Sequence, residues 1–330
     1  MTVTTEKRHW VGFDLGGSKM LAAVFDETFK PIARQRKRTK AQEGAGGGLK
    51  RMVALIEAAL ADAGVGADRL AGIGVGCPGP LDLDKGVVLE MPNIGWKKMA
   101  VRTELEKAFG CPVVIANDVD AGVYGEYRFG AARGARCVVG VFPGTGIGGG
   151  AVYEGEIIRG NKGSCMEIGH VPVIVDGPLC GCGRRGCLEA IAGRLAIAAA
   201  AAAAAYRGEA PYLLARAGTD VANIRSRALS EAVAAGDAAV ESIVRAAART
   251  IGWTMAGVVN LLAPDVVLLG GGLVEDMPTL FRDEVDAAVK ARVMPSYDGT
   301  FEVVVAKLAG DATITGAAAW AQRTVAAAAA

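Results

Sequence analysis

Short apolar runs alternate along this chain with segments in which apolar residues recur at helical spacing. Residues 10–15 and 20–25 are two apolar runs joined by a Gly-Gly turn, which predicts a β-hairpin. Residues 49–63 place apolar side chains three and four positions apart, which predicts a helix after a flexible break at residues 44–48. Strands and helices mixed in this way predict an α/β fold.

The second half of the chain opens like the first, with an apolar run, a Gly-rich turn at residues 144–150 and a second apolar run. This repeat predicts two similar α/β halves. No Pro-rich or Ser-rich linker separates them, so we expect them to pack closely around a cleft. Further strands are predicted at 70–76, 112–116, 137–142, 151–158 and 265–269, a basic strand or loop at 31–40, and helices at 101–109, 190–207, 237–262 and 313–330.

Length and charge narrow the class of protein. A chain of 330 residues is long enough for about two domains. Lys and Arg number 36 against 35 Asp and Glu, so no net field attracts nucleic acid or an anionic membrane. The first residues lack the apolar core of a signal peptide, and no long uncharged apolar stretch predicts a membrane span. We therefore expect a cytoplasmic protein with no nucleic-acid or membrane partner.

Three Gly-rich turns each follow a predicted strand, at Gly16, Gly144 and Gly270. Glycine lets backbone N–H groups approach an anion closely, although any tight hairpin also favours glycine. The pattern at 144–149 matches a dinucleotide fingerprint, but a strand follows it instead of a helix, which excludes that fold. The polar residues of these turns suit phosphate or a hydrated metal ion: Asp14, Ser18, Lys19 and Thr145.

The most specific motif combines His170 with Cys180, Cys182 and Cys187. One imidazole and three thiols form a closed tetrahedral set suited to zinc, and a closed set leaves no position for a reactive water. We therefore predict structural Zn²⁺. The alternatives are unligated buried cysteines and a zinc knuckle that binds nucleic acid, and the neutral net charge argues against the knuckle.

Carboxylates flank the predicted zinc ligands. Glu167 lies three residues before His170, and Glu189 lies two residues after Cys187. Two carboxylates and an imidazole N–H suit a polyhydroxylated ligand such as a sugar, although both glutamates could instead be solvated.

A further acidic position follows the strand predicted at 112–116. Asn117 and Asp118 sit at its carboxyl end, where α/β active sites usually lie. Asp118 could accept the proton of a substrate hydroxyl during attack on a phosphoryl group. The pair could equally cap the helix that starts at Val119.

Four motifs together resemble the ROK family of sugar kinases and repressors, and within it the bacterial zinc-containing glucokinases. The resemblance extends from about Val11 to Gly316, with the motifs in the family's order: 13–19, 144–149, 167–170 and 180–189. It implies an actin-like fold of two RNase H-like domains, with ATP, Mg²⁺ and a sugar in the cleft. It also implies a homodimer or homotetramer.

The resemblance assigns a role to each matched residue. Asp118 would be the general base on the sugar 6-hydroxyl. The predicted sugar ligands are Asn93, Asn117, Asp118, Glu167, His170 and Glu189, with Gly79 nearby. The predicted phosphate and Mg²⁺ contacts are Asp14, Gly16, Gly17, Ser18 and Lys19. The predicted nucleotide contacts are Thr145, Gly146, Gly270, Gly271 and Gly272.

The implied function is phosphorylation of glucose by ATP. The alternatives are another hexose or N-acetylhexosamine (fructose, mannose, allose, N-acetylglucosamine or N-acetylmannosamine), polyphosphate as donor, and a non-catalytic sugar-binding or regulatory protein. A DNA-binding regulator is disfavoured because the first strand is predicted to begin by Trp10. The domains are predicted as 1–117 with 310–330, and 118–309 with the zinc site.

Three residues depart from the family pattern. Ser18 replaces Thr and keeps the hydroxyl. Asp120 replaces an Asn and adds charge near the proposed base. Met166 replaces a Gly, and its bulk is expected to narrow the sugar pocket.

Overall fold

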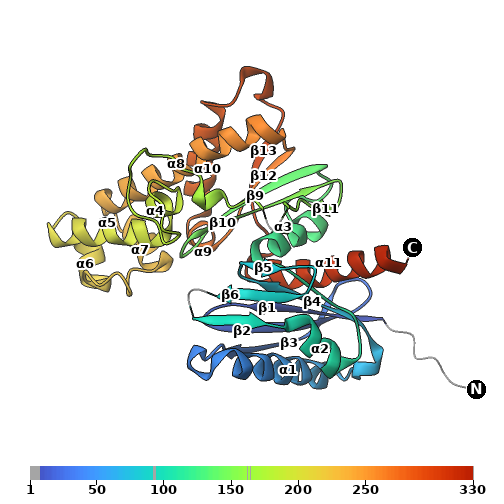
Figure 1. Ribbon diagram of the computed structural model, residues 1–330. Helices are drawn as coiled ribbons and strands as arrows, with labels where there is room; N and C mark the ends of the chain where they lie inside the picture. Colours follow the sequence, from blue (N-terminus) through green and yellow to red (C-terminus); the bar gives the residue numbers. More distant parts are fainter. Residues whose placement is uncertain (1–7, 92–93, 162, 164, 330) are drawn as a thin grey trace, which may run out of the picture. The chain divides into compact units, whose positions relative to one another are not determined.

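The computed structural model describes residues 8–91, 94–161, 163 and 165–329 (Figure 1). Its contacts divide the chain into two compact units. The first comprises Met1–Gly134, Gly155–Cys165 and Gly310–Ala330, and the second comprises Ala135–Glu154 and Met166–Ala309. This grouping places residues 118–134 in the first unit, whereas the sequence-based division assigns them to the second domain.

A five-stranded sheet with the order β3-β2-β1-β4-β8 forms the centre of the first unit. The strands are β1 (His9–Leu15), β2 (Lys19–Phe25), β3 (Pro31–Arg38), β4 (Leu70–Cys77) and β8 (Val113–Asn117). β1 pairs with β2 in antiparallel orientation, which confirms the predicted hairpin, whereas β1–β4 and β4–β8 are parallel. The carboxyl ends of β1, β4 and β8 therefore lie at one edge of the sheet.

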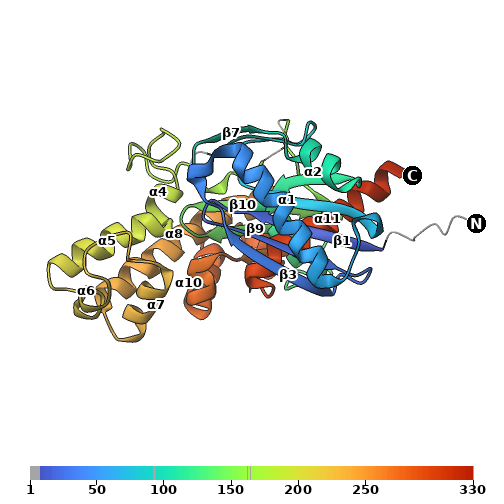
Figure 2. The same ribbon diagram turned by 90° about the horizontal axis from the view of Figure 1, so that it is seen from below.

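Helices cover both faces of this sheet. α1 (Gly44–Ala63) and α2 (Val101–Phe109) lie on one face, and α11 (Ala312–Ala329) lies on the other beside α3 (Asp118–Phe129) (Figure 1). Figure 2 shows α1 in front of the strands of this sheet. A smaller sheet, β5-β6-β7, completes the unit with β5 (Leu81–Asp82), β6 (Val87–Met91) and β7 (Trp96–Met99).

Alternation along β1 assigns its side chains to the two faces. Phe13 and Leu15 join the apolar core that also contains Leu55 of α1. Gly12 faces the opposite way, because a Cβ built there would lie 1.9 Å from the carbonyl oxygen of Ile314 in α11. One face of the strand thus packs by side chains and the other by close backbone approach.

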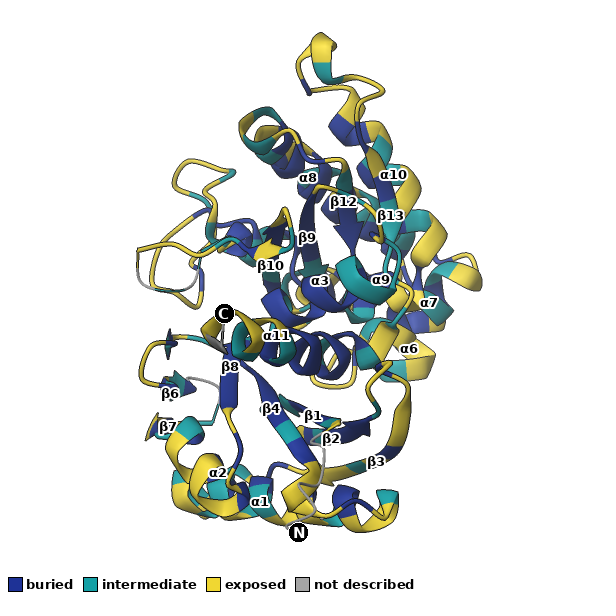
Figure 3. Ribbon diagram, turned by 90° about the vertical axis from the view of Figure 1, so that its right-hand side faces the viewer, coloured by how far each residue is buried: buried dark blue, intermediate teal, exposed yellow. Residues whose placement is uncertain are grey.

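Glycines also allow α11 to approach β4 and α3. A Cβ at Gly74 would lie 1.8 Å from the Ala317 carbonyl oxygen, and one at Gly316 would lie 1.7 Å from that of Ala121. The contact region of α11 is buried, as its dark segment in Figure 3 shows. Close packing along α11 is the reason that α3 groups with the first unit.

The second unit repeats the strand pattern of the first. Its strands are β9 (Cys137–Pro143), β10 (Ile147–Tyr153), β12 (Val266–Leu269) and β13 (Glu302–Val305), in the order β10-β9-β12-β13. β9 and β10 form an antiparallel hairpin, and β9–β12 and β12–β13 are parallel. The short β11 (Glu156–Ile157) follows β10 in the chain. The predicted duplicated, actin-like α/β fold is confirmed.

Helices make up most of the remaining second unit: α4 (Glu189–Ala192), α5 (Arg194–Tyr206), α6 (Pro211–Ala217), α7 (Ser226–Ala234), α8 (Ala238–Leu262), α9 (Gly272–Asp276) and α10 (Pro278–Lys290). The prediction of one helix over 190–207 is wrong, because Gly193 takes an extended conformation, with ψ of 156°, between α4 and α5. By length and composition Glu189–Tyr206 could cross a membrane, yet 44% of it is buried in the structure, and a core helix meets the same criterion.

The predicted break at residues 44–48 is also wrong, because these residues form the first turns of α1. Gly48 is needed there for packing. A Cβ at this position would lie 2.3 Å from the indole ring of Trp96. Tertiary packing therefore overrides the weak helix propensity of the glycines.

Replacing Gly316 with Ala tests the close approach of α11. The methyl group would overlap the Ala121 carbonyl, so the free energy of unfolding should fall by roughly 1–3 kcal/mol or more. Gly46→Ala is the matched control, because Gly46 lies in α1 with open space around its Cβ position. Urea unfolding that shows equal stability for both variants would contradict this packing.

Candidate active site and metal centre

The turn between β1 and β2 is held by a side chain from outside the hairpin. The Gly16 N–H donates to the Lys19 carbonyl at 3.0 Å, and a Cβ at Gly16 would lie 2.7 Å from that oxygen. The Thr39 hydroxyl donates to the Gly16 carbonyl at 2.6 Å, and the Thr39 N–H donates to the Ser18 carbonyl at 3.0 Å. Thr39 is fully buried. No local pattern in the sequence marks Thr39, because its partner Gly16 lies 23 residues away.

Candidate catalytic residues of the first unit gather at the carboxyl edge of its sheet. Asp14 in β1 is paired in register with Gly76 of β4, and the adjacent Cys77 is paired with Asn117 of β8. Asp118 is the first residue of α3. The strand ends thus bring Asp14 and Asp118 to neighbouring positions, as parallel strands require.

The helix-capping role falls to Asn117. Its side-chain oxygen accepts hydrogen bonds from the N–H groups of Val119 at 2.9 Å and Asp120 at 3.2 Å. Asp118 adds one further contact, since its Oδ1 accepts from the Val119 N–H at 3.0 Å. Because Asn117 already caps α3, the Asp118 carboxylate is not required as the cap.

Asp14 has a strongly perturbed acidity. Burial raises the pKa of its carboxyl from 3.8 to about 7, with a further increase from the negative charge of Asp118, and Lys19 opposes both. Two neighbouring carboxylates in a partly buried site favour a cation between them. This position therefore suits a divalent metal that accompanies phosphate.

The second Gly-rich turn, between β9 and β10, is braced by Glu189. The Gly144 N–H donates to the Gly146 carbonyl at 2.8 Å, and the Ile147 N–H donates to Glu189 Oε2 at 3.0 Å. A Cβ at Gly146 would lie 2.1 Å from the same oxygen, so a larger residue there would displace the Glu189 carboxylate from the turn. The structure thus gives Glu189 a positioning contact that the sequence analysis did not predict.

The third Gly-rich turn follows β12. Gly271 has φ of +83°, and a Cβ there would lie 2.8 Å from the Pro143 carbonyl oxygen. Helix α9 begins directly after this turn, at Gly272. A Cβ at Gly272 would face the Ser226 hydroxyl at 3.6 Å, so the turn adjoins the beginning of α7.

The four predicted metal ligands converge within the second unit. His170, Cys180, Cys182 and Cys187 each offer one ligand atom, and these atoms all lie within 4.8 Å of one another. The Sγ atoms of Cys182 and Cys187 are 3.7 Å apart, and Cys180 Sγ is 3.6 Å from His170 Nδ1. This group can hold a metal ion.

Glycines close the loop that carries the cysteines. Gly183 and Gly186 have φ of +84° and +75°, and a Cβ at Gly186 would lie 1.8 Å from the Ile174 carbonyl oxygen. The glycines at these two positions therefore let the loop fold tightly around the thiols.

The three thiols differ in acidity when no metal is bound. Burial raises the pKa of Cys180 to about 12 and raises that of Cys187, whereas the backbone N–H of Arg184 lowers the pKa of Cys182. Because a metal binds thiolates, its binding would release protons from this cluster.

The predicted sugar ligands are divided between the two units. Asn117 and Asp118 belong to the first, whereas Glu167, His170 and Glu189 belong to the second. Glu167 is exposed beside the short 3-10 turn Ile168–His170. Gly79 lies near the Asn117 amide, with 4.0 Å between its Cβ position and Nδ2. Asn93 lies outside the described residues, and the joint binding of one sugar by this set stays a prediction.

Met166 occupies a position that suits glycine. It has φ of +58°, in the left-handed region that costs a non-glycine residue free energy. A glycine would adopt this backbone conformation at a lower cost.

The duplicated sheet, with a hairpin at the start of each half, defines an actin-like protein, and its second unit carries a His-Cys₃ cluster that can hold a metal ion. The chain belongs to the ROK family, whose model matches residues 10–324. It is similar to the glucokinase of Thermotoga maritima, with 33% identity over 313 residues that cover 93% of this chain and 95% of that protein.

Two further relatives show the range of the family. A ROK family glucokinase from Streptomyces griseus, solved in complex with glucose and AMPPNP, is 32% identical with a TM-score of 0.83, covering 96% of this chain and 99% of that chain. The DNA-binding transcriptional repressor Mlc of Escherichia coli is 27% identical over 319 residues, which cover 96% of this chain and 77% of the repressor. Kinases and repressors therefore share this architecture.

The acidity of Asp14 predicts a pH-dependent stability. Between pH 3.8 and about 7 the folded protein keeps a proton that the unfolded chain has lost, so stability falls as pH rises through this window. Asp14→Asn removes the titration. Its gain in unfolding free energy over wild type should grow from pH 4 to pH 8, up to about 4 kcal/mol.

Urea unfolding without added magnesium or nucleotide measures this difference. Asp26→Asn is the control, because the Thr28 hydroxyl lowers the pKa of this exposed carboxyl, and its effect should be constant between pH 5 and 8. A pH-independent gain for Asp14→Asn would contradict the raised pKa.

Proposed function

We propose that this protein is an ATP-dependent sugar kinase that phosphorylates the 6-hydroxyl of glucose. The observation that carries this proposal is the position of Asp14 and Asp118. Both lie at the carboxyl edge of the sheet, at the ends of β1 and β8, in a chain of the ROK family. The proposal is supported by similarity over almost the whole chain to proteins named as glucokinases.

Asp118 is the proposed general base. Asn117 caps α3, and the Thr313 hydroxyl donates to the Asp118 carbonyl at 3.2 Å, so the backbone at this residue is held from two sides. A fixed carboxylate can accept the proton of the sugar hydroxyl as its oxygen attacks the terminal phosphoryl group of the donor. Most of the remaining catalysis is positioning and charge neutralisation.

The glycine turns are the proposed phosphate contacts, and Asp14 would hold Mg²⁺. A bound divalent ion would favour the Asp14 carboxylate over its protonated form and would neutralise phosphate charge. Lys19 follows the same turn and supplies a further positive charge, as its effect on Asp14 shows.

The His-Cys₃ cluster fits Zn²⁺. At tetrahedral angles, bonds of about 2.3 Å to sulfur place two thiolates about 3.8 Å apart, and a shorter bond to nitrogen brings sulfur and nitrogen to about 3.6 Å. The distances of 3.7 Å and 3.6 Å agree with these values. Zinc would fix the loop between His170 and Cys187, and with it the adjoining Glu167 and Glu189.

Two alternatives concern the substrates. Met166 precedes Glu167, so the pocket could favour another hexose or an N-acetylhexosamine over glucose. Polyphosphate is the alternative donor. A regulatory protein is the alternative to an enzyme, because the repressor Mlc is among the relatives.

Asp118→Asn tests the base. The variant should still bind glucose but lose about 10²–10⁴-fold in turnover, since it keeps the shape and loses the proton acceptor. ADP release with Mg²⁺-ATP, measured across glucose, mannose, fructose, allose and the two N-acetylhexosamines, gives both the activity and the preferred sugar. Asp62→Asn, on α1, is the matched control. Near-normal turnover in Asp118→Asn would refute the assignment.

Cys182→Ser tests the metal centre. Wild-type protein should contain about one zinc per chain, and the variant should lose metal together with sugar affinity or folding, because one of four ligands is gone. Elemental analysis and calorimetry with glucose measure both. Cys165→Ser is the control, since Cys165 lies outside the cluster. A metal-free, fully active wild type would rule out the zinc assignment.

A further inference from the structure

An arginine that no motif marked lies beside the second Gly-rich turn. Arg194, the first residue of α5, donates through Nη2 to the Thr145 hydroxyl at 3.1 Å, and its backbone N–H donates to the Gly144 carbonyl at 3.0 Å. Nη1 of Arg194 is 3.5 Å from the Ile224 carbonyl oxygen, one residue before Arg225. The Arg194 side chain therefore joins the turn to the segment that precedes α7.

Arg194, Arg225 and the residues near them come from four separate parts of the second unit. Thr145 lies in the β9–β10 turn, Arg194 starts α5, Arg225 precedes α7, and Gly272 starts α9. Ser226 connects the last two, because its hydroxyl lies 3.6 Å from the Cβ position of Gly272. The Arg194 guanidinium group thus lies between the turn at Thr145 and the segment that leads through Arg225 to the Gly272 turn.

The two positive charges have no acidic partner. Within the described residues, neither guanidinium group forms a hydrogen bond or an ion pair with a carboxylate. Burial lowers the pKa of Arg194, and the charge of Arg225 lowers it further. The exposed Arg225 thus adds a second positive charge near the half-buried Arg194, and an anion would stabilise both.

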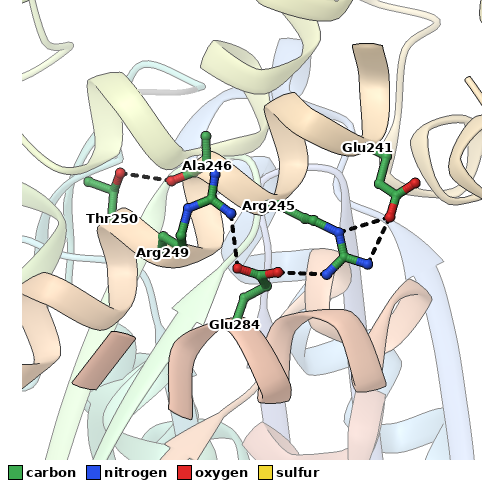
Figure 4. A network of polar contacts seen from close by, with 6 residues as sticks. All are labelled: Glu241, Arg245, Ala246, Arg249, Thr250 and Glu284. Atoms are coloured by element: carbon green, nitrogen blue, oxygen red, sulfur yellow. Dashed lines mark hydrogen bonds and ion pairs between the residues drawn. The ribbon is translucent and has the colours of Figure 1, made fainter. Parts of the chain in front are cut away.

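Several other arginines of the same unit pair with carboxylates. Arg227, two positions from Arg225, pairs with Glu231 at 3.0 Å. Between α8 and α10, Arg245 and Arg249 share the carboxylate of Glu284, at 2.6 Å and 3.1 Å (Figure 4). The absence of such a partner distinguishes Arg194 and Arg225 from these arginines.

We propose that Arg194 and Arg225 bind the phosphate chain of the nucleotide, next to the turn at Gly144–Gly146. This inference rests on the proposed function, which it extends by two phosphate-binding residues. The ligand class is a nucleoside di- or triphosphate. Arginine suits it because the planar guanidinium group donates two parallel hydrogen bonds to phosphate oxygens.

Nucleotide binding by calorimetry tests the pair. Arg194→Gln and Arg225→Gln should each weaken ADP binding by at least about tenfold, because each removes a charge-assisted hydrogen bond to phosphate. AMP, with one phosphate, should be affected less than ADP. Inorganic tripolyphosphate should compete with ADP on wild type and compete less well on either variant. Arg194→Lys should recover part of the affinity because it keeps the charge.

Arg227→Gln is the matched control and should bind ADP like wild type, since Glu231 neutralises this arginine. Equal loss of AMP and ADP affinity would indicate a merely structural role and overturn the inference, as would unchanged ADP binding in both variants. Failure of the proposed function would differ from failure of this inference. Wild type would then release no ADP with any sugar, while binding of ADP and tripolyphosphate would still show whether the two arginines hold phosphate.

Discussion

The close approach of α11 to the first sheet is the constraint on which the catalytic edge depends. Gly12 and Gly74 let the helix backbone lie against β1 and β4, and Gly316 lets α3 lie against α11. Thr313 of the same helix then donates to the Asp118 carbonyl. The depth at which α11 sits therefore sets where Asp118 stands relative to Asp14, and the proximity of these two carboxylates follows from it.

In the second unit, Glu189 joins two features that are separate in the sequence. One of its oxygens accepts the Ile147 N–H of the Gly-rich turn, and the other lies 3.7 Å from Cys180 Sγ in the metal cluster. A metal that fixes the cysteine loop would also fix this carboxylate and hence the turn. We infer that the cluster acts on the chemistry by positioning, since its four ligands leave no open coordination position.

Two of the departures from the family pattern, Met166 and Asp120, lie in different structural surroundings. Met166 keeps a left-handed backbone in spite of its side chain, so the fold around Glu167 imposes this conformation. Asp120 is almost fully buried in α3, and its charge raises the pKa of Arg159 against the lowering effect of burial. The proposed reaction class depends on residues that match the family, whereas the choice among the proposed sugars is expected to depend on departures such as Met166.

Local signals in the sequence predicted the strand pairs, the longest helices and the metal ligands. Apolar runs located both hairpins, and helical spacing located α1, α2, α8 and α11, whereas no helix was predicted for α6, α7, α9 or α10. The spacing of His170 and the three cysteines marked the metal cluster. The remaining features depend on contacts between residues that are far apart in the sequence, so they follow only from the tertiary structure. Helix α1 includes Gly44–Gly48, with Trp96 packed against Gly48. Thr39 holds a turn 23 residues away, and Arg194 donates to the Ile224 carbonyl, which follows α5 and α6 in the chain. Burial beside Asp118 gives Asp14 a pKa of about 7, and this shift arises only when the strand ends are side by side.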